Sequence, residues 1–230
     1  MNSLILKYLK LMPKVIVVEG LIASGKTSLL NILKSKYPNS HSIFEPVDEW
    51  EKSGALNEFY DSLKLENPSP YIYTFQTYAF MSRIKRILNE IKKVPDAEVY
   101  FLERSIFSDR YLFVDMLMES GLLSKKDYQL YTDWWELWSL VMPVKIDGFI
   151  YLNPSPEECI RRLKNRNRSS EKEVTLEYQN ALKEKHDNFL KRDIKIEEKI
   201  IPCLELNTDS DFRVDNKEIL EKIKNFVDSI

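Results

Sequence analysis

Residues 15–27 of the chain read VIVVEGLIASGKT, and this segment sets the fold. Its first four residues are apolar and β-branched, which is typical of a strand buried on both faces of a parallel sheet. The residues from Gly20 to Thr27 match the pattern G-x-x-x-x-G-K-[ST], and a helical pattern follows directly. The two glycines let backbone N–H groups close around phosphate oxygens at the positive end of that helix. The segment therefore predicts a strand, a phosphate-binding loop and a helix.

Two side chains of this loop carry chemistry. Lys26 is expected to reach the β and γ phosphates of a nucleoside triphosphate, and the Thr27 hydroxyl is expected to ligate Mg²⁺. A chance match in a strand-to-helix turn is the alternative, but the chain has only 5 glycines and two of them stand here. The guanine-reading pattern N-K-x-D does not occur in the sequence, which argues against a guanine-nucleotide switch. The expected ATP-binding loop residues are Gly20, Leu21, Ile22, Ala23, Ser24, Gly25, Lys26 and Thr27.

Composition restricts the class of protein. With 230 residues, the chain suits one large domain, and 43% hydrophobic residues suffice for a core. A net charge of -2 is too weak and of the wrong sign for a surface that binds nucleic-acid polymers. No apolar run reaches the ~18 residues of a membrane helix. Two cysteines, Cys159 and Cys203, favour a reducing compartment, so the sequence predicts a cytoplasmic protein. The start of the chain, with three lysines and no acid before residue 15, leaves a mitochondrial location open.

Short apolar runs alternate with long amphipathic stretches along the chain. We expect strands at Val15–Val18, Ser42–Phe44, Val99–Leu102, Phe149–Leu152 and Cys203–Leu206. We expect helices at Thr27–Lys36, Tyr73–Lys93, Lys125–Val141, Pro156–Arg166, Leu176–Arg192 and Asn216–Val227. This alternation predicts an α/β fold with a doubly wound, five-stranded parallel sheet and helices on both faces.

Two local signals refine these helices. Ser155, Pro156 and Glu158 predict a capping box with proline at the first helical position. The stretch Lys183–Lys199 is mixed in charge sign, and its simplest interpretation is a solvated helix face.

Charged residues follow two of the expected strands directly. Glu45 comes after the second strand, and Glu103 and Arg104 come after the third. Ligands of a doubly wound sheet bind beyond the carboxyl ends of its strands, and a charge there loses hydration unless it has a partner. Glu103 could therefore hold Mg²⁺ and Arg104 could contact the moving phosphoryl group. The alternative for Glu103 and Arg104 is a mutual ion pair that caps the strand.

A third group lies on the long helix predicted over Tyr73–Lys93. Gln76 and Arg83 are seven residues apart, so both lie on one face of this helix, among aromatic residues. An amide and a guanidinium in that setting could hydrogen-bond a planar heterocycle. The alternative is an ordinary amphipathic helix with both groups in solvent.

Five blocks in order over about residues 14–215 resemble the deoxyribonucleoside kinase family, which includes the deoxycytidine, deoxyguanosine and deoxyadenosine kinases. The blocks are the phosphate loop, Glu45-Pro46-Val47 with Trp50, Phe75-Gln76-Thr77-Tyr78 through Arg83, Glu103-Arg104-Ser105 through Asp109-Arg110-Tyr111, and Tyr151-Leu152 through Arg162, Arg166, Arg168 and Glu171 to Tyr178. The resemblance implies a P-loop kinase with an Arg-rich lid that uses ATP and Mg²⁺ to phosphorylate the 5'-hydroxyl of a deoxyribonucleoside.

The resemblance implies catalytic roles for matching residues at the acceptor end. Glu45 would take the proton from the sugar 5'-hydroxyl, and Arg104 would contact the 5'-oxygen. Glu103 would serve Mg²⁺ together with Thr27, or be counted as the proton acceptor. With Lys26, these residues form the expected catalytic set.

Recognition of the nucleoside is likewise implied by the resemblance. Gln76, Arg83 and Asp109 would read the edge of the base, and Glu171 would lie at the 3'-hydroxyl side of the sugar. The family places a tyrosine before the Phe-Gln motif to bind that hydroxyl, with two residues between the tyrosine and a proline. Here Tyr60 precedes Pro68 by eight positions, so either the loop carries an insertion or the sugar tyrosine is replaced.

At the donor end, the resemblance implies that Arg162, Arg166 and Arg168 form a lid over ATP, at about residues 162–173. Asp209 to Phe212 would face adenine, with Ser210, Asp211 and Phe212 as contacts. Three arginines at spacings of four and two can neutralise charge on a triphosphate.

The expected domain organisation is an N-terminal extension over residues 1–13 and one kinase domain over residues 14–230. The family also implies a homodimer through helices such as Lys125–Val141, with Trp134, Trp135 and Trp138. Ordinary core packing of these tryptophans is the alternative.

Two other functions fit the phosphate loop. A nucleoside monophosphate kinase of thymidylate-kinase type also has such a loop and a stretch like Asp109-Arg110-Tyr111, but Glu45 would repel a phosphate on its acceptor. A non-catalytic nucleotide-binding scaffold would not need Lys26, Glu103 and Arg104 together.

Charge pairing makes a prediction about the preferred base. Arg83 and Asp109 are expected to pair with each other in an aromatic pocket, where an unpaired charge is costly. Such a pair matches the amino group of an adenine, cytosine or guanine better than the carbonyl and methyl of thymine. The sequence predicts a preference for amino-bearing deoxynucleosides over thymidine.

Overall fold

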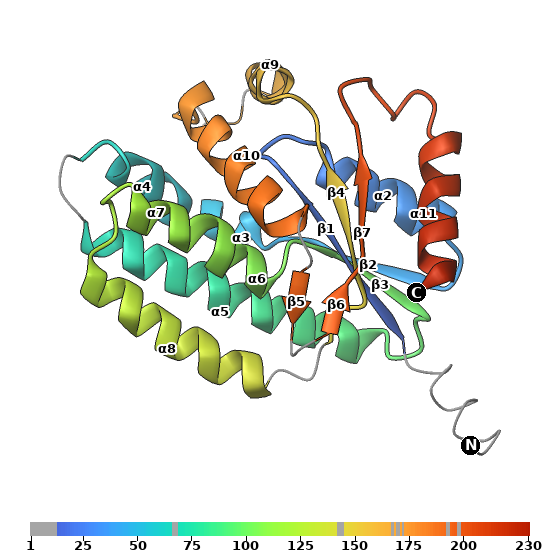
Figure 1. Ribbon diagram of the computed structural model, residues 1–230, viewed down its shortest axis with the longest axis horizontal. Coiled ribbons are helices and arrows are strands. Elements are labelled where there is room, and N and C mark those ends of the chain that lie inside the picture. Colours follow the sequence, from blue (N-terminus) through green and yellow to red (C-terminus); the bar gives the residue numbers. More distant parts are fainter. Residues whose placement is uncertain are drawn as a thin grey trace.

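The computed structural model describes residues 13–65, 69–141, 145–166, 168, 171, 173–191, 194–196 and 199–230, and a five-stranded sheet forms its centre (Figure 1). Every pairing in this sheet is parallel, and the order across it is β2-β3-β1-β4-β7. The strands are β1 (Lys14–Gly20), β2 (Ser40–Ile43), β3 (Val99–Glu103), β4 (Gly148–Leu152) and β7 (Cys203–Leu206). This confirms the predicted doubly wound fold. The expected second strand differs in its bounds, because Phe44 lies beyond the end of β2.

Alternation along β1 explains why helices cover both faces of the sheet. Val15 and Val17 pack into a cluster with side chains of the helices on one face, and Ile16 and Val18 pack into a second cluster on the other. Because all four are 6% exposed or less, β1 is a central strand with no polar face. The register pairs Val18 with Glu103, so the carboxyl ends of β1 and β3 meet at one edge.

The helices agree with the sequence prediction where the amphipathic pattern is long. The predicted long helices are α2 (Lys26–Lys36), α5 (Pro70–Lys93), α8 (Lys125–Val141), α9 (Pro156–Arg166), α10 (Leu176–Leu190) and α11 (Lys217–Ser229). Short elements that the pattern did not predict are α3 (Val47–Lys52), α4 (Ala55–Ser62), α6 (Ile106–Ser108), the π-helix η1 (Asp109–Val114) and α7 (Asp115–Glu119).

The prediction of a helix face over Lys183–Lys199 is wrong in its second half. Helix α10 ends at Leu190, and an antiparallel hairpin of β5 (Ile194–Ile196) and β6 (Lys199–Ile201) follows. The prediction considered the charges in this stretch and overlooked its four isoleucines, at positions 194, 196, 200 and 201. Isoleucine is β-branched, and β-branched residues at this density favour strands. Ile201 is buried against the sheet.

The predicted capping box at Ser155 is only half formed. The Ser155 hydroxyl accepts a hydrogen bond from the Glu158 N–H at 3.3 Å, as an N-cap does. The Ser155 N–H donates to Asp209 Oδ1 at 2.7 Å instead of to the Glu158 side chain. The Glu158 carboxylate accepts from Arg161 and Arg162, so two arginines replace the backbone as its partner.

Residues 1–12, which make up most of the expected N-terminal extension, lie outside the described residues. Among the helices that the structure describes, no helix combines the length and the hydropathy that a membrane span requires. Cys159 and Cys203 are both free thiols.

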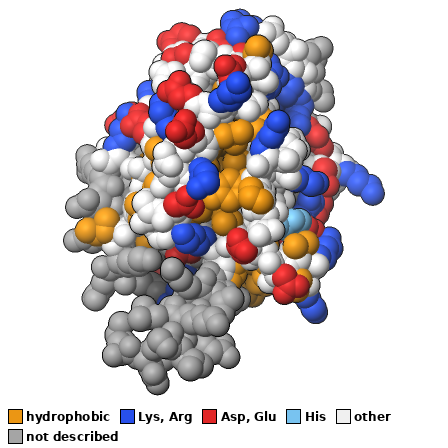
Figure 2. Space-filling view, turned by 90° about the vertical axis from the view of Figure 1, so that its right-hand side faces the viewer, with side chains coloured by type: hydrophobic (Ala, Val, Ile, Leu, Met, Phe, Trp, Pro, Cys, Tyr) orange, Lys and Arg blue, Asp and Glu red, His pale blue; other side chains and the backbone are white. Residues whose placement is uncertain are grey.

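Figure 2 shows the side of the molecule that faces right in Figure 1, where α2 and α11 lie. A band of hydrophobic side chains runs through this face, with Lys, Arg, Asp and Glu on either side. The partly buried side chains Ile32, Tyr37, Phe226 and Ile230 pack on the cluster beneath these helices. This face is therefore the outer surface of one helical layer.

Candidate active site

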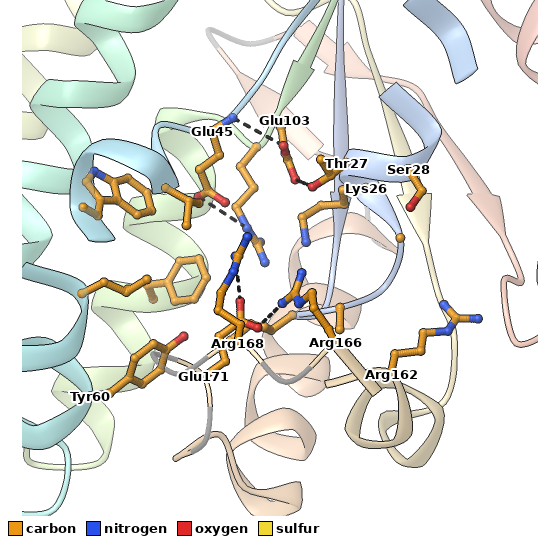
Figure 3. A pocket seen from close by; sticks show the side chains of 18 of the residues that line it. Lys26, Thr27, Ser28, Glu45, Tyr60, Glu103, Arg162, Arg166, Arg168 and Glu171 are labelled. Atoms are coloured by element: carbon orange, nitrogen blue, oxygen red, sulfur yellow. Dashed lines mark hydrogen bonds and ion pairs between the residues drawn. The ribbon is translucent and has the colours of Figure 1, made fainter. Parts of the chain in front are cut away.

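A pocket of about 550 Å³ opens where β1, β2 and β3 end, in front of the phosphate loop (Figure 3). Its apolar wall comes from α3, α4 and α5, and its charged wall comes from the phosphate loop, the ends of β2 and β3, and α9. This is the edge at which doubly wound sheets bind ligands. The apolar wall includes Val47, Trp50, Leu56, Phe59 and Phe75.

Both glycines of the phosphate loop are required by geometry. Gly20 has φ +148° and Gly25 has φ +105°, in the region that side chains rarely adopt. A Cβ at Gly20 would lie 2.5 Å from the carbonyl oxygen of Leu152, and one at Gly25 would lie 3.0 Å from the Phe212 ring. The loop can therefore close tightly only with glycine at both positions.

Lys26 lies folded over the phosphate loop. Its Nζ donates to the carbonyl oxygens of Leu21 at 2.8 Å and Gly20 at 3.1 Å. Burial and the neighbouring charge of Arg104 lower the pKa of Lys26 to about 8. Phosphate oxygens favour the charged amine, so a bound triphosphate would hold Lys26 protonated.

Oxygen donors that suit Mg²⁺ lie at the start of α2. The Thr27 hydroxyl donates to Glu103 Oε1 at 2.6 Å, and Glu103 Oε2 accepts from the Glu45 N–H at 3.4 Å. Burial, followed by the charge of Glu45, raises the pKa of Glu103. The described residues contain no group of three or more His, Cys, Asp and Glu side chains of the kind that encloses a metal. A hydroxyl and one carboxylate suit Mg²⁺, which keeps waters and substrate phosphates as further ligands.

Arg83 joins two carboxylates that the sequence assigned to different tasks. Its Nε and Nη2 donate to the two carboxylate oxygens of Asp109 at 2.8 and 2.9 Å, which confirms the predicted pair. Its Nη2 also donates to Glu45 Oε1 at 2.7 Å, and its Nη1 donates to the Glu103 carbonyl at 3.2 Å. The Gln76 side chain, on the same helix, is 3% exposed and lines the pocket. The prediction that Gln76 and Arg83 share one helix face toward a site is confirmed.

Opposing effects set the pKa values of these two acids. Burial alone would raise the pKa of Glu45, but the charges of Arg83, Arg104 and Lys26 outweigh it and leave that pKa lowered. Burial raises the pKa of Asp109, and the charge of Arg83 offsets part of the rise. Glu45 is therefore held ionised, as a proton acceptor must be.

Arg104 has an unusual backbone as well as a central place in the site. Its φ is +62°, in the left-handed region, which β3 and the following turn impose on a non-glycine residue. Its guanidinium donates to the Gly20 carbonyl at 2.9 Å and lies 4.9 Å from the centre of the Phe113 ring. Its Nε is 3.8 Å from Glu45 Oε1. The alternative of a Glu103–Arg104 ion pair is not found, because Thr27 takes Glu103 and other partners take Arg104.

The three arginines of the expected lid do not act alike (Figure 3). Arg162 Nη1 donates to the Ser24 carbonyl at 3.1 Å, and its Nη2 donates to the carbonyls of Thr208 and Asp209, so it ties the phosphate loop to the loop after β7. Arg166 and Arg168 instead point to Glu171. Only part of the expected lid, residues 162–173, belongs to the described residues.

Tyr60 and Glu171 lie together on one wall of the pocket (Figure 3). Glu171 accepts from Arg168 at 3.1 Å and from Arg166, and Arg168 Nε reaches Glu51 of α3 at 3.2 Å. Burial, followed by the charges of Tyr178 and Glu171, raises the pKa of Tyr60 well above its usual value. Tyr60 is thus placed in the pocket despite its distance from Pro68, which lies outside the described residues.

Not every expected ATP contact lines the pocket. Gly20, Leu21, Ser24 and Ser210 are absent from its lining, and Leu21 is fully buried in the core. Ile22, Ala23, Gly25, Lys26, Thr27, Arg162, Arg166, Arg168, Asp211 and Phe212 do line it.

Sequence reasoning missed several apolar residues of the site. Leu56 and Phe59 come from α4, for which no periodic pattern was recognised. Phe113 lies four residues after Asp109, so helical spacing could have found it on the same side. Tyr178 also lines the pocket, and its hydroxyl has no hydrogen-bond partner among the described residues.

Comparison with known proteins places this geometry in context. The family model described as deoxynucleoside kinase matches residues 16–228. A fowlpox virus protein named "Probable deoxycytidine kinase" is 35% identical over 221 residues, which cover 94% of this chain and 89% of the viral one. Mouse deoxycytidine kinase is 34% identical, with 94% and 92% covered. The mitochondrial deoxyguanosine kinase of Xenopus laevis is 32% identical, with 91% and 88% covered.

Proposed function

Because the chain belongs to the deoxynucleoside kinase family, we propose that Glu45 accepts the 5'-hydroxyl proton of a deoxyribonucleoside while ATP supplies the phosphoryl group. The protein is a kinase of deoxynucleosides, and phosphorylation at the 5'-position makes the monophosphate for nucleotide salvage. The observation that carries the division of roles is the position of the Glu45 carboxylate at the end of β2, 2.7 Å from Arg83 Nη2 and 3.8 Å from Arg104 Nε, whose charges lower its pKa. A neutral hydroxyl can approach this carboxylate.

A nucleoside monophosphate kinase of thymidylate-kinase type is not favoured. Its acceptor carries a phosphate, which requires free cations where the acceptor binds. Here Glu45 and Asp109 already occupy Arg83, and the relatives named above act, by their names, on deoxynucleosides.

The roles of the remaining side chains follow from their contacts. Glu45 orients the 5'-hydroxyl and takes its proton, while Arg104 stabilises charge on the oxygens of the moving phosphoryl group. Lys26 exchanges two loop carbonyls for the β and γ phosphates. When ATP binds, Arg166 and Arg168 move their hydrogen bonds from Glu171 to phosphate oxygens. The Glu171 carboxylate can then accept a hydrogen bond from the sugar 3'-hydroxyl, beside Tyr60. Arg162 holds the loop itself in place.

Thr27 and Glu103 are the proposed ligands of Mg²⁺. When bound, Mg²⁺ neutralises charge on the donor phosphates. In this arrangement Glu103 serves the metal and Glu45 serves the proton, because Glu103 is already turned to the Thr27 hydroxyl at the start of α2. Asp211 and Phe212 line the pocket, with the Phe212 ring next to Gly25 of the phosphate loop, and are proposed to face adenine, with Ser210 in the same loop.

The test of this function is a competition assay with ATP and an equal mixture of the four common deoxynucleosides. We expect deoxycytidine or deoxyadenosine to be phosphorylated ahead of deoxyguanosine, and thymidine to be a poor substrate. Asp109 is an acceptor held by Arg83, so it suits a base with an amino group and opposes the thymine carbonyl and methyl. A preference for thymidine would contradict this specificity, and turnover of a deoxynucleoside monophosphate alone would contradict the function.

Changing the charge pair should change the preference. Replacing Arg83 by Met and Asp109 by Ala together should raise thymidine activity relative to deoxycytidine by about tenfold, because the mismatch disappears with both charges. Asp109→Ala alone should lower activity on every substrate, because Arg83 then lacks its bidentate partner and competes for Glu45. The same competition assay measures both results. The interpretation fails if the single and double variants show the same substrate ranking.

We further propose that the protein is a homodimer through α8. Leu130, Trp134, Leu137 and Val141 recur at helical spacing, and each is at least 42% exposed. An exposed apolar stripe of this kind marks an interaction surface. Trp135, by contrast, is 8% exposed and donates to the Ile106 carbonyl, so it is core. Core packing therefore accounts for Trp135, and Trp134 is the tryptophan that we propose for the interface.

Trp134→Glu should convert the dimer to a monomer, because it places a charge in the centre of the stripe. Sedimentation equilibrium at micromolar concentration measures the mass. Glu136→Ala is the matched control, since Glu136 is exposed on the opposite side of α8 and should leave the dimer intact. A monomeric wild-type protein, or a dimeric Trp134→Glu variant, would rule out this interface.

The cytoplasm is the proposed compartment, on the basis of two free thiols in 230 residues. The named relatives include a mitochondrial kinase, so fractionation of cells that express the full chain decides the compartment.

A further inference from the structure

Glu19 is a completely buried carboxylate next to the active site. It is the residue before Gly20, its exposed fraction is 0%, and it does not line the pocket. Burial raises the pKa of Glu19, and the charge of Arg104 offsets part of the rise, so the ionised carboxylate depends on a partner that the fold supplies. No role in nucleotide or nucleoside binding accounts for a carboxylate in this place.

Three elements meet at the Glu19 carboxylate. The Ser108 hydroxyl, from α6, donates to Glu19 Oε1. Arg104 Nη1, at the end of β3, donates to Oε2 at 3.3 Å. His186 Nε2, from α10, lies 3.9 Å from the same Oε2. Glu19 therefore lies where α6, the end of β3 and α10 come together.

His186 contributes no hydrogen bond to this carboxylate. Its Nδ1 is 2.7 Å from the Leu182 carbonyl, which can only accept, so Nδ1 carries the proton and a neutral ring leaves Nε2 without one. Burial and the charge of Arg104 lower the pKa of His186 well below its usual value, which keeps the ring neutral. The ring also stacks on Tyr151 with centroids 5.6 Å apart and closes this side of the cluster. Within the described part of the chain, Arg104 is thus the one cation hydrogen-bonded to Glu19.

Arg104 lies between two carboxylates, the buried Glu19 and the pocket residue Glu45. On the side away from substrate it contacts Glu19, and on the pocket side its Nε is 3.8 Å from Glu45 Oε1. The pocket-side contact is beyond hydrogen-bond distance, whereas those to Glu19 and to the Gly20 carbonyl are within it. The ion pair with Glu19 therefore holds the Arg104 guanidinium out of hydrogen-bond distance of Glu45. Glu45 Oε1 already accepts from Arg83 Nη2, so the second carboxylate oxygen, Oε2, is the one left for the 5'-hydroxyl.

We propose that Glu19 is a positioning residue for phosphoryl transfer, whose carboxylate holds the Arg104 guanidinium beside the reacting oxygen and apart from Glu45. This inference rests on the proposed function of Arg104 and Glu45. Without the charge on Glu19, Arg104 closes on Glu45 and the two groups neutralise each other. The chemical step is then slowed, while the binding of ATP and nucleoside, which other residues provide, persists.

The first test is Glu19→Gln, which keeps the shape of the side chain and removes its charge. We expect kcat to fall by about 30-fold, with dissociation constants for ATP and deoxycytidine changed by less than about threefold. Binding is measured by calorimetry without turnover, and folding by thermal denaturation. The matched control is Glu90→Gln, because Glu90 is also a carboxylate held by side chains, with His41 at 3.0 Å and Lys93 at 2.6 Å, but does not line the pocket. Its kcat should equal that of the wild type.

The second test separates positioning from general support of the fold. If Glu19 acts through Arg104, then Glu19→Gln should cause no further loss of kcat in an Arg104→Ala protein, within about threefold. A structural role would instead multiply the two losses. Arg104→Ala alone leaves the buried Glu19 charge unpaired and could prevent folding. The double variant removes both charges, so we expect it to fold. If Arg104→Ala does not fold, Glu19→Gln is instead combined with Arg104→Lys.

The outcomes distinguish the inference from the function on which it rests. Wild-type protein that phosphorylates no deoxynucleoside would overturn the proposed function. An active wild type, together with a folded Glu19→Gln variant of normal kcat, would overturn the positioning role alone. Multiplied losses in the double variant, or an ATP dissociation constant that rises as much as kcat falls, would also overturn it.

Discussion

Lys26→Ala should lower kcat by about three orders of magnitude while the protein stays folded. In the structure the Lys26 amine is buried against two loop carbonyls, at the point where the β and γ phosphates are proposed to bind. No other side chain of the phosphate loop carries a positive charge. Charge that develops on the moving phosphoryl group would therefore lose its nearest counter-charge from the loop.

A coupled assay with saturating ATP and deoxycytidine measures the loss, and thermal denaturation checks the fold. Lys34→Ala is the matched control, because Lys34 lies on the same helix but is exposed and outside the pocket. Arg104→Ala should reduce kcat by a similar factor. Near-normal turnover in a folded Lys26→Ala or Arg104→Ala protein would remove that residue from the mechanism.

Glu45→Gln should lower kcat by about a hundredfold or more and change the nucleoside dissociation constant by less than about threefold. Glutamine keeps the shape and one hydrogen-bond acceptor, but it has almost no proton affinity. Arg83 would keep both oxygens of Asp109 as partners, so the base-reading pair should survive the change. The substitution thus removes the proton acceptor and leaves recognition intact.

Glu49→Gln provides the matched control for this variant. Glu49 is a neighbouring glutamate on α3 that pairs with Arg86, and it does not line the pocket. Single-turnover kinetics and equilibrium titration with deoxycytidine separate the two quantities. Weak binding with normal turnover would make Glu45 a binding residue only, and would return Glu103 as the candidate for the proton acceptor.

Long periodic patterns made most of the fold predictable. The strand at Val15–Val18 and the helix that follows the phosphate loop are specified by local sequence, because burial on both faces and the glycine pattern leave little choice. Helices α3 and α4 have no such pattern, since each has eight residues or fewer and Gly54 separates them. Their position depends on tertiary contacts, such as the bond from Trp50 to Ser82 and its edge-to-face contact with Phe75. Sequence periodicity cannot report contacts of that kind.

The candidate site was predictable as a set of residues but not as a network. Chemistry at the strand ends pointed to Glu45, Glu103 and Arg104. The family resemblance put Arg83 and Asp109 at the base, and the cost of an unpaired buried charge then predicted their pairing. The bond from Arg83 to Glu45 joins residues 38 apart in the chain, and the Arg104–Glu19 bond joins residues 85 apart. Such contacts arise from the order of strands in the sheet, and no local pattern encodes them.

Because Arg83 contacts both Asp109 and Glu45, we expect the enzyme to discriminate among nucleosides in the phosphoryl-transfer step as well as in binding. One cation, Arg83, holds both Asp109, which we propose meets the base, and Glu45, which we propose receives the proton. A nucleoside that draws Arg83 out of line therefore also disturbs Glu45, at the opposite end of the molecule it has bound. The nucleosides are then expected to differ in how fast they are phosphorylated once bound. A nucleoside analogue could therefore bind tightly here as an inhibitor and still resist phosphorylation.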